Sequence, residues 1–167
     1  MPEQETLERA RKDRAEGKSP TTQAGEFVRE EMHHIREGKH GARSAKQAIA
    51  IGLSKARRAG VDLPPPKKGR TSAKTRQSAK RAYEAGHSNG RHKTSPKRSR
   101  ATTRALKREG HAAASHQALS RQASAAARKR SPAERSAAAR KGAASRTHAE
   151  RSASARKAAR TRKRHGR

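Results

Sequence analysis

The pattern of hydrophobic and polar positions predicts its best-defined helix at residues 44–60, SAKQAIAIGLSKARRAG. Apolar residues recur there at helical spacing and gather on one side of a helix drawn at about 100° per residue. Ser44 and Gln47 have the spacing of a capping box, which satisfies free backbone N–H groups of the first turn. Gly60 stands where a helix ends in the left-handed conformation. Both ends of this helix are therefore encoded locally.

Two further helices are expected before it. Residues 2–16 carry acids early and bases late, as the helix dipole favours, and a glycine follows as a stop. Residues 23–37 carry an apolar stripe at i, i+4, i+7 spacing, with Thr21 or Thr22 as the cap. The short connector 38–43 predicts that this helix folds back antiparallel on the next one. We expect the core between them to consist of Phe27, Val28, Met32, Ile35, Ile49 and Leu53.

This helical pair has a second interpretation as a helix-turn-helix, in which the 44–60 helix would read DNA. That motif usually has a turn of only three or four residues, and the connector here is longer. A pair this small also buries little apolar surface compared with the entropy that its ordering costs. We therefore expect the first helix to dock on the pair, or the N-terminal helices to self-associate into a homo-oligomer.

The pattern changes after Leu63. Large apolar residues are frequent before this point, and beyond it only Tyr83, Leu106 and Leu119 remain. Three prolines at 64–66 favour a stiff, extended spacer. The predicted organisation is a helical module of two to three helices at 1–63, a Pro-rich basic linker at 64–70 and a basic Ala/Arg/Ser tail at 71–167.

The tail ends in an imperfect repeat, in which residues 131–146 match residues 147–162 at 10 of 16 positions. Both copies open with a capping box, Ser131 with Glu134 and Thr147 with Glu150. Alanine and arginine favour helix, whereas the repulsion between bases and the lack of bulky apolar residues oppose a folded state.

The expected fold class is therefore mainly α, with a long, non-globular tail of short Ala/Arg helices that is largely disordered when free. Helices are expected from 71 to 85 and from 95 to 109, with a loop at 86–94 between them.

Charge indicates the partner of the tail. The chain of 167 residues has 44 Lys or Arg and 14 Asp or Glu, and its net charge of +30 divides into +3 for residues 1–63 and +27 for residues 64–167. Solubility requires a net charge of only about 2–8 on a small domain. The excess predicts a polyanionic partner.

The basic segments lack the bulky apolar face of a membrane-surface helix, and no apolar run approaches the ~20 residues of a membrane span. Nucleic acid is therefore favoured, with no membrane partner.

Duplex DNA is the preferred nucleic acid, because one aromatic residue in the tail provides no platform for stacking unpaired bases. Ser95-Pro-Lys-Arg98 resembles the Ser-Pro-basic-basic turns of linker-histone tails, which sit in A/T-rich minor grooves; an ordinary helix cap is the other interpretation. The candidate phosphate-binding residues are the clustered bases Lys67, Lys68, Arg70, Lys97, Arg98, Arg100, Arg128, Lys129, Arg130, Arg140, Lys141, Arg156, Lys157, Arg160, Arg162, Lys163 and Arg164.

No catalytic residue, cofactor or metal site is predicted. His33 and His34 are adjacent and face different sides of a helix, and two other histidine pairs lie five apart, off the i, i+4 spacing of helical metal ligands. The chain has no cysteine. We expect the nine histidines to act as additional phosphate donors, and Glu30 and Glu31 to lie on a helix surface.

The segment KQAIAIGLSKARRAG at 46–60, preceded by VREEMHHIREGKHGARSA, resembles a small bacterial family of unknown function. The similarity covers about Phe27 to Gly60, and its signature is a KQAIAI-ALS-EAR helix behind a Val/Met helix and a Gly-rich link. Gly52 and Lys55 stand where that signature has alanine and an acid. The resemblance implies a bacterial origin and carries over no functional residues. The tail is similar in composition to the Ala/Lys/Arg-rich tails of bacterial histone-like proteins.

The resulting hypothesis is a non-enzymatic, largely sequence-independent DNA-binding protein of the nucleoid-associated, histone-like kind, which neutralises phosphates in the cytoplasm. The charged first 17 residues predict neither a signal peptide nor a membrane anchor. Two alternatives stay open: an RNA-binding or ribosome-associated protein, and a protein-binding adaptor that is localised by its basic tail.

Overall fold

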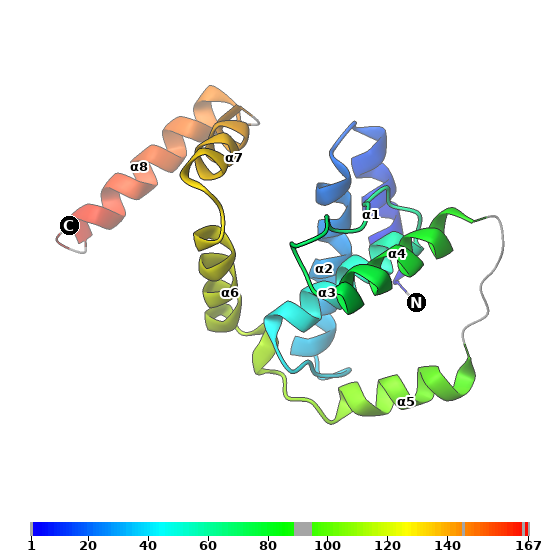
Figure 1. Ribbon diagram of the computed structural model, residues 1–167. Helices are drawn as coiled ribbons and strands as arrows, with labels where there is room; N and C mark the ends of the chain where they lie inside the picture. Colours follow the sequence, from blue (N-terminus) through cyan, green and yellow to red (C-terminus); the bar gives the residue numbers. More distant parts are fainter. Residues whose placement is uncertain (1, 89–94, 145, 165, 167) are drawn as a thin grey trace. The chain divides into compact units, whose positions relative to one another are not determined.

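The computed structural model describes residues 2–88, 95–144, 146–164 and 166. These residues form helices and no strand, which confirms the mainly α fold class (Figure 1). The α-helices are α1 (Gln4–Ala15), α2 (Pro20–Arg36), α3 (Ala45–Arg58), α4 (Ala73–His87), α5 (Pro96–Lys107), α6 (His116–Arg128), α7 (Pro132–Ala144) and α8 (His148–Arg164), with a short 3-10 turn, η1 (Ala112–Ala114), before α6. None of these helices has the length and apolar character that crossing a bilayer requires.

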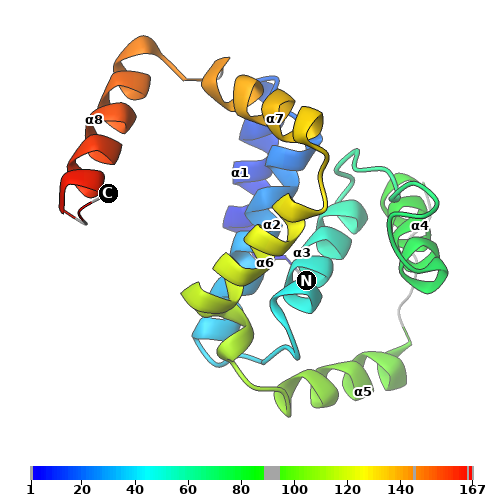
Figure 2. The same ribbon diagram turned by 60° about the vertical axis from the view of Figure 1, so that its left-hand side comes forward.

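Helices α2 and α3 pack antiparallel at the centre of the first part of the chain, as the connector predicted (Figure 2). Phe27, early in α2, shares a core cluster with Ala56 near the end of α3, and Ile35, late in α2, shares another with Ala48 near the start of α3. The two helices approach closely at Gly52, where a Cβ atom would lie 2.7 Å from the Cα of Val28. An alanine cannot occupy this position without displacing backbone.

The six predicted core residues all lie in these two clusters. Phe27, Met32 and Ile35 are buried, and Val28, Ile49 and Leu53 are half-buried. The cluster around Phe27 is completed by Ala10 and Leu7 of α1 and by Val61 and Leu63 after α3. The first helix therefore docks on the pair, which is one of the two outcomes that the small size of the pair predicted.

The tail, however, also contributes to the packed structure, which the sequence analysis did not predict. Ala79 and Ala82 are buried where α4 packs on α3. A Cβ at Gly86 would overlap the carbonyl oxygen of Arg57, so this glycine permits a very close approach inside α4. Helix α4 continues through Gly86 and ends at His87, whereas the sequence predicted that it stops before Gly86. The rest of the predicted 86–94 loop lies mostly outside the described residues.

A second tail segment closes the cluster around Ile35. Ala113 and Ala114 of η1 are buried in this cluster, and Leu119 of α6 packs against it. The side chain of Arg36 donates a hydrogen bond from Nε to the carbonyl oxygen of Ala114 at 3.0 Å. The connector between α2 and α3 is tied to α5, because the Gly41 N–H donates to the Leu106 carbonyl at 2.9 Å.

The expectation of a non-globular and largely disordered tail therefore needs correction. The first compact unit runs from Met1 to Gln122, well beyond the sequence-based boundary at 63, and a second unit runs from Ala123 to Arg167. The physical reason is that alanine and glycine bury surface by close backbone approach, whereas the sequence criterion searched for bulky side chains.

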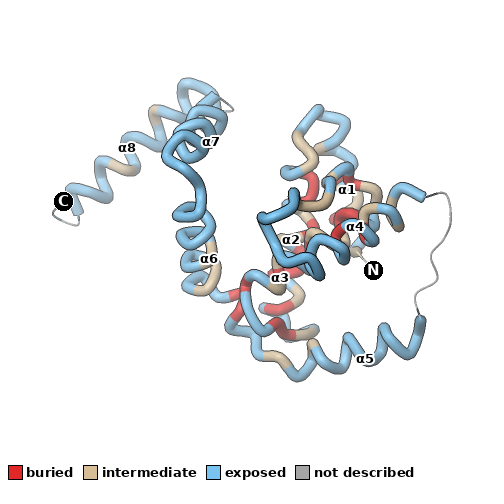
Figure 3. Tube along the Cα trace, in the orientation of Figure 1, coloured by how far each residue is buried: buried red, intermediate tan, exposed pale blue. Residues whose placement is uncertain are grey.

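The second unit contains the end of α6, α7 and α8, and none of the residues that the structure describes in these helices is buried (Figure 3). Its helices rely on local signals. Ser131 and Glu134 form the predicted capping box, with the Ser131 N–H donating to Glu134 Oε2 at 2.8 Å and the Glu134 N–H donating to Ser131 Oγ at 3.2 Å. Thr147 and Glu150 form the second one in the same way. These short Ala/Arg helices confirm the helical part of the prediction for the tail.

Helix ends elsewhere largely follow the sequence signals. Ser44 Oγ accepts a hydrogen bond from the Gln47 N–H at 3.2 Å, and Gly60 has φ +84° after the end of α3. The start of α2 differs, because the helix begins at Pro20, with Ser19 as the preceding residue, and not after Thr21 or Thr22. Proline suits the first position of a helix, where its missing N–H would have had no helical partner.

Candidate nucleic-acid interface

Every predicted phosphate-binding residue is exposed. They occupy four places along the chain: the linker with Lys67, Lys68 and Arg70; α5 with Lys97, Arg98 and Arg100; the end of α6 and the α7 segment with Arg128, Lys129, Arg130, Arg140 and Lys141; and α8 with Arg156, Lys157, Arg160, Arg162, Lys163 and Arg164. Exposure makes all of them accessible to an anionic partner.

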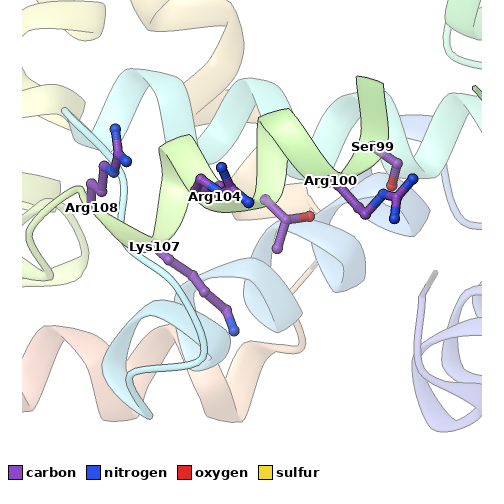
Figure 4. Close-up of a pocket in the computed structure, with 6 residues that line it drawn as sticks. Ser99, Arg100, Arg104, Lys107 and Arg108 are labelled. Atoms are coloured by element: carbon purple, nitrogen blue, oxygen red, sulfur yellow. The ribbon is translucent and has the colours of Figure 1, made fainter. Parts of the chain in front are cut away.

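Helix α5 presents a continuous basic face. Arg100, Arg104, Lys107 and Arg108 line an open surface hollow together with Ser99 and Thr103 (Figure 4). Residues spaced by three, four and seven positions lie on one side of a helix, which explains the alignment of these side chains. Within the described part of the chain, none of the four cations forms an ion pair.

Of this group, only Arg100 was among the predicted phosphate-binding residues. Arg104 has no basic neighbour in the sequence and is missed by a criterion of adjacent bases, whereas Lys107 and Arg108 are adjacent and were left out nonetheless. Spacings of i+4, i+7 and i+8 from Arg100 relate all four bases. Ser95–Arg98 lies at the start of α5, where Ser95 precedes the helix without a capping hydrogen bond from its side chain and Pro96 occupies the first helical position.

Helix α8 carries a second basic face, formed at i, i+1, i+4, i+7 and i+8 by Arg156, Lys157, Arg160, Lys163 and Arg164. Its single acid, Glu150, lies in the first turn, where hydrogen bonds from Thr147 lower the pKa of its carboxyl group. An acid at the amino end and bases at the carboxyl end both interact favourably with the helix dipole. The bases are therefore compatible with a stable helix.

The N-terminal bases differ, because several are engaged with acids of the same module. Arg9 donates from Nε to Glu26 Oε2 at 2.6 Å and also pairs with Glu5. Lys18 Nζ lies 2.8 Å from Asp13 Oδ1 and 2.7 Å from Glu16 Oε2. Such pairs reduce the charge that this region can present to a polyanion.

A buried ionic cluster lies between α2 and α3, and it corrects the prediction for Glu30 and Glu31. Their side chains are 1% and 0% exposed, so they do not lie on a helix surface. Lys55 Nζ reaches both, at 3.2 Å from Glu30 Oε1 and 2.8 Å from Glu31 Oε2. Burial disfavours the charged Lys55, but its close contacts and charge interactions with Glu31 and Glu30 outweigh burial and raise its pKa. A lysine at position 55 is thus the counter-charge of two buried acids.

Two histidines join this cluster. His34 Nε2 lies 2.8 Å from Glu3 Oε1, and His40 Nε2 lies 3.3 Å from Glu31 Oε1. His33 is exposed on the other side of α2, as its position next to His34 predicted. The proposal that all histidines serve as phosphate donors does not fit His34 and His40, which are largely enclosed by the module. The sequence did not reveal this group because His40 comes from the connector and not from a helix.

Residues 17–68 match the model of a family of unknown function (DUF6496). No curated protein and no solved structure matches the chain. The matched segment contains all of α2 and α3 together with Glu30, Glu31, His34, His40 and Lys55, and it ends before α4. The chain is therefore similar to an uncharacterised family over its α2–α3 module, and the match does not extend to the basic helices α5–α8.

Proposed function

We propose that this protein is a non-enzymatic, largely sequence-independent DNA-binding protein of the bacterial nucleoid-associated, histone-like kind. The observation that carries the proposal is the exposed basic faces of α5 and α8, where the bases of one helix side face solvent. A cation that has no acid beside it in the protein is free to replace the counterions of a phosphate, and the released counterions drive binding.

The density of charge on α8 matches that of DNA. The five bases of this face lie within the stretch from Arg156 to Arg164. At about 1.5 Å per residue this stretch is about 12 Å long, or one positive charge per ~2.4 Å. Duplex DNA carries one negative charge per ~1.7 Å of its axis. The two densities are close enough for most of the bases on this face to find a phosphate.

The second unit as a whole supports the same role. Residues 123–167 contain 15 Lys or Arg and two Glu, a net charge of +13. Contacts of arginine and lysine side chains with phosphate oxygens do not involve the bases, so they carry little sequence information. The packed α1–α4 module would then serve as the scaffold from which the basic helices extend.

The test compares two variants of the full chain that lose the same charge in different places. The α8 variant replaces Arg156, Lys157, Arg160, Lys163 and Arg164 with glutamine. The control variant replaces five exposed bases of α1–α3 with glutamine, namely Arg11, Arg14, Arg29, Arg43 and Lys46. Binding to a labelled duplex is measured by fluorescence anisotropy at several salt concentrations.

We expect the α8 variant to bind more weakly than the control variant at every salt concentration. If all five bases contact phosphates, the slope of log K against log salt becomes shallower by about 4.5. Equal losses in the two variants would show that net charge alone matters and would contradict an interface on α8. Preference for structured RNA over duplex DNA in competition at matched salt would favour the RNA-binding alternative.

A further inference from the structure

We propose that Glu31, His34 and His40 form a binding site for a divalent transition-metal ion of the Zn²⁺ class. One ligand atom from each of the three side chains lies within 4.8 Å of the other two. Two imidazoles and one carboxylate are a donor set that suits such ions and that recurs in zinc sites with an open coordination position. This inference does not depend on the proposed function in DNA binding.

The distances fit a metal ion with little movement. Bonds of about 2.1 Å in a tetrahedral zinc site place neighbouring ligand atoms about 3.4 Å apart. His40 Nε2 and Glu31 Oε1 already lie 3.3 Å apart. A small side-chain rotation would bring the remaining ligand atom of His34 into the same range, because Glu31 and His34 are three residues apart on one face of α2.

The hydrogen bond of His40 prepares it for metal binding. Its Nδ1 lies 3.1 Å from the carbonyl oxygen of Gly41, and a carbonyl can only accept, so Nδ1 carries the hydrogen. In the neutral ring, Nε2 then has the free lone pair, and this is the atom beside Glu31. A second hydrogen bond that fixes the tautomer is typical of histidines that bind metal ions.

The buried carboxylate of Glu31 provides a second, independent argument for a cation site. Its side chain is fully buried, and among the described residues no donor makes a hydrogen bond of good geometry to either of its oxygens. Lys55 Nζ lies 2.8 Å from Glu31 Oε2, but it also forms an ion pair with Glu30. Two buried carboxylates thus share one ammonium group, which leaves one negative charge in the interior for a further cation to balance.

The site has the access that an ion needs. The side chains of His34 and His40 are 12% and 16% exposed, so one edge of the cluster meets solvent. Glu3, half-exposed at this edge, pairs with His34 and with Lys39. The coordination positions left open by the three ligands would be filled from solvent.

The experiment uses the full chain, first treated with a chelator and then titrated with Co²⁺ and with Zn²⁺ at neutral pH. Co²⁺ bound to imidazole and carboxylate ligands gives visible absorption bands that report the coordination directly. We expect these bands to saturate at one ion per chain, Zn²⁺ to displace Co²⁺, and Zn²⁺ to raise the Tm. His40→Ala should weaken Zn²⁺ binding by about 100-fold or more, because loss of a direct ligand exceeds the effect of losing a supporting residue.

The matched control is His33→Ala, which removes an exposed histidine next to His34. It should keep the Co²⁺ bands and the Zn²⁺-dependent rise in Tm. The proposal is wrong if the unmodified chain shows no Co²⁺ bands at saturation, or if His33→Ala and His40→Ala weaken binding equally. In the first case the cluster is an ion-pair network that takes up a proton, and in the second the binding is adventitious. The spectrum of the unmodified chain decides the matter even if His40→Ala does not fold.

Discussion

At the scale of single residues, glycines determine where the helices of the first unit approach one another. Gly52 lies at a close contact of α3 with α2, and Gly86 lies against the end of α3. Their positions in the sequence did not predict these contacts, because a glycine in a helical pattern can equally mark the end of a helix or a position at which the helix is less stable. Only the position of the facing backbone distinguishes these roles.

Gly52→Ala should destabilise the protein. The added Cβ would lie 2.7 Å from Val28 Cα and 3.0 Å from the Phe27 carbonyl oxygen, so the helices must move apart. Overpacking of this kind costs about 1–3 kcal/mol, which exceeds the gain in helix propensity of about 1 kcal/mol. Thermal and urea unfolding of the full chain measure the difference.

Gly25→Ala is the matched control in the same pair of helices. A Cβ at Gly25 meets no atom within 4 Å, so only helix propensity changes, and the variant should be more stable by up to about 1 kcal/mol. Should both alanine variants gain stability, the close approach at Gly52 would be absent in solution.

The sequence also did not indicate the burial of Glu30 and Glu31. Carboxylates next to each other on a helix normally lie in solvent, and the burial here depends on Lys55 reaching across from α3. The counter-charge comes from a different element, so no local pattern contains it. The proximity of His40 to His34 was not predicted for the same reason, because the two histidines come from different elements.

At the scale of elements, the sequence predicted best what is determined locally. The capping boxes at Ser131 and Thr147 and the left-handed glycine after α3 occur where the pattern placed them. At Ser44 one half of the box forms, and the Gln47 side chain accepts from the Arg43 N–H instead of the Ser44 N–H. Each depends on residues within four positions, so sequence spacing is sufficient. The docking of α4 depends on tertiary contacts of alanines with α3, which a search for bulky apolar residues cannot detect.

The docking of α4 can be followed through Tyr83, the only tyrosine in a chain without tryptophan. Its hydroxyl donates to Asp62 Oδ1 at 2.6 Å, and this hydrogen bond is the main cause that raises the pKa of Tyr83. The fold favours the neutral phenol. Its contribution to stability is present below the ordinary pKa of about 10 and is lost as the pH rises through the raised value.

We expect Asp62→Ala to lower the pKa of Tyr83 towards the ordinary value of about 10, as measured by near-ultraviolet absorbance during a pH titration. Glu84→Ala is the control, since it removes a neighbouring negative charge that does not bond the phenol. A tyrosine that titrates at the same pH in the unmodified chain and in Asp62→Ala would mean that α4 is not held against residue 62.

At the scale of the whole molecule, the charge is distributed as the proposed roles of the packed module and of the basic helices require. The sequence predicted the exposed basic residues correctly, because 44 bases and 14 acids in one chain leave most bases without an acid. It did not predict how far the compact first unit extends, since Met1–Gln122 is held together in part by small residues of the tail. Composition therefore predicts the exposure of the bases better than it predicts the domain boundary.

The measurement that tests the DNA-binding proposal most directly is the salt dependence of binding for the full chain. Two duplexes of equal length and different sequence are compared by anisotropy over a range of salt concentrations. If about ten phosphates are contacted, the slope of log K against log salt is about −9, and the two duplexes bind alike. A slope shallower than about −3 would mean that only about three phosphates are neutralised, and such a slope, or a strong preference for one sequence, would contradict phosphate neutralisation by the basic helices.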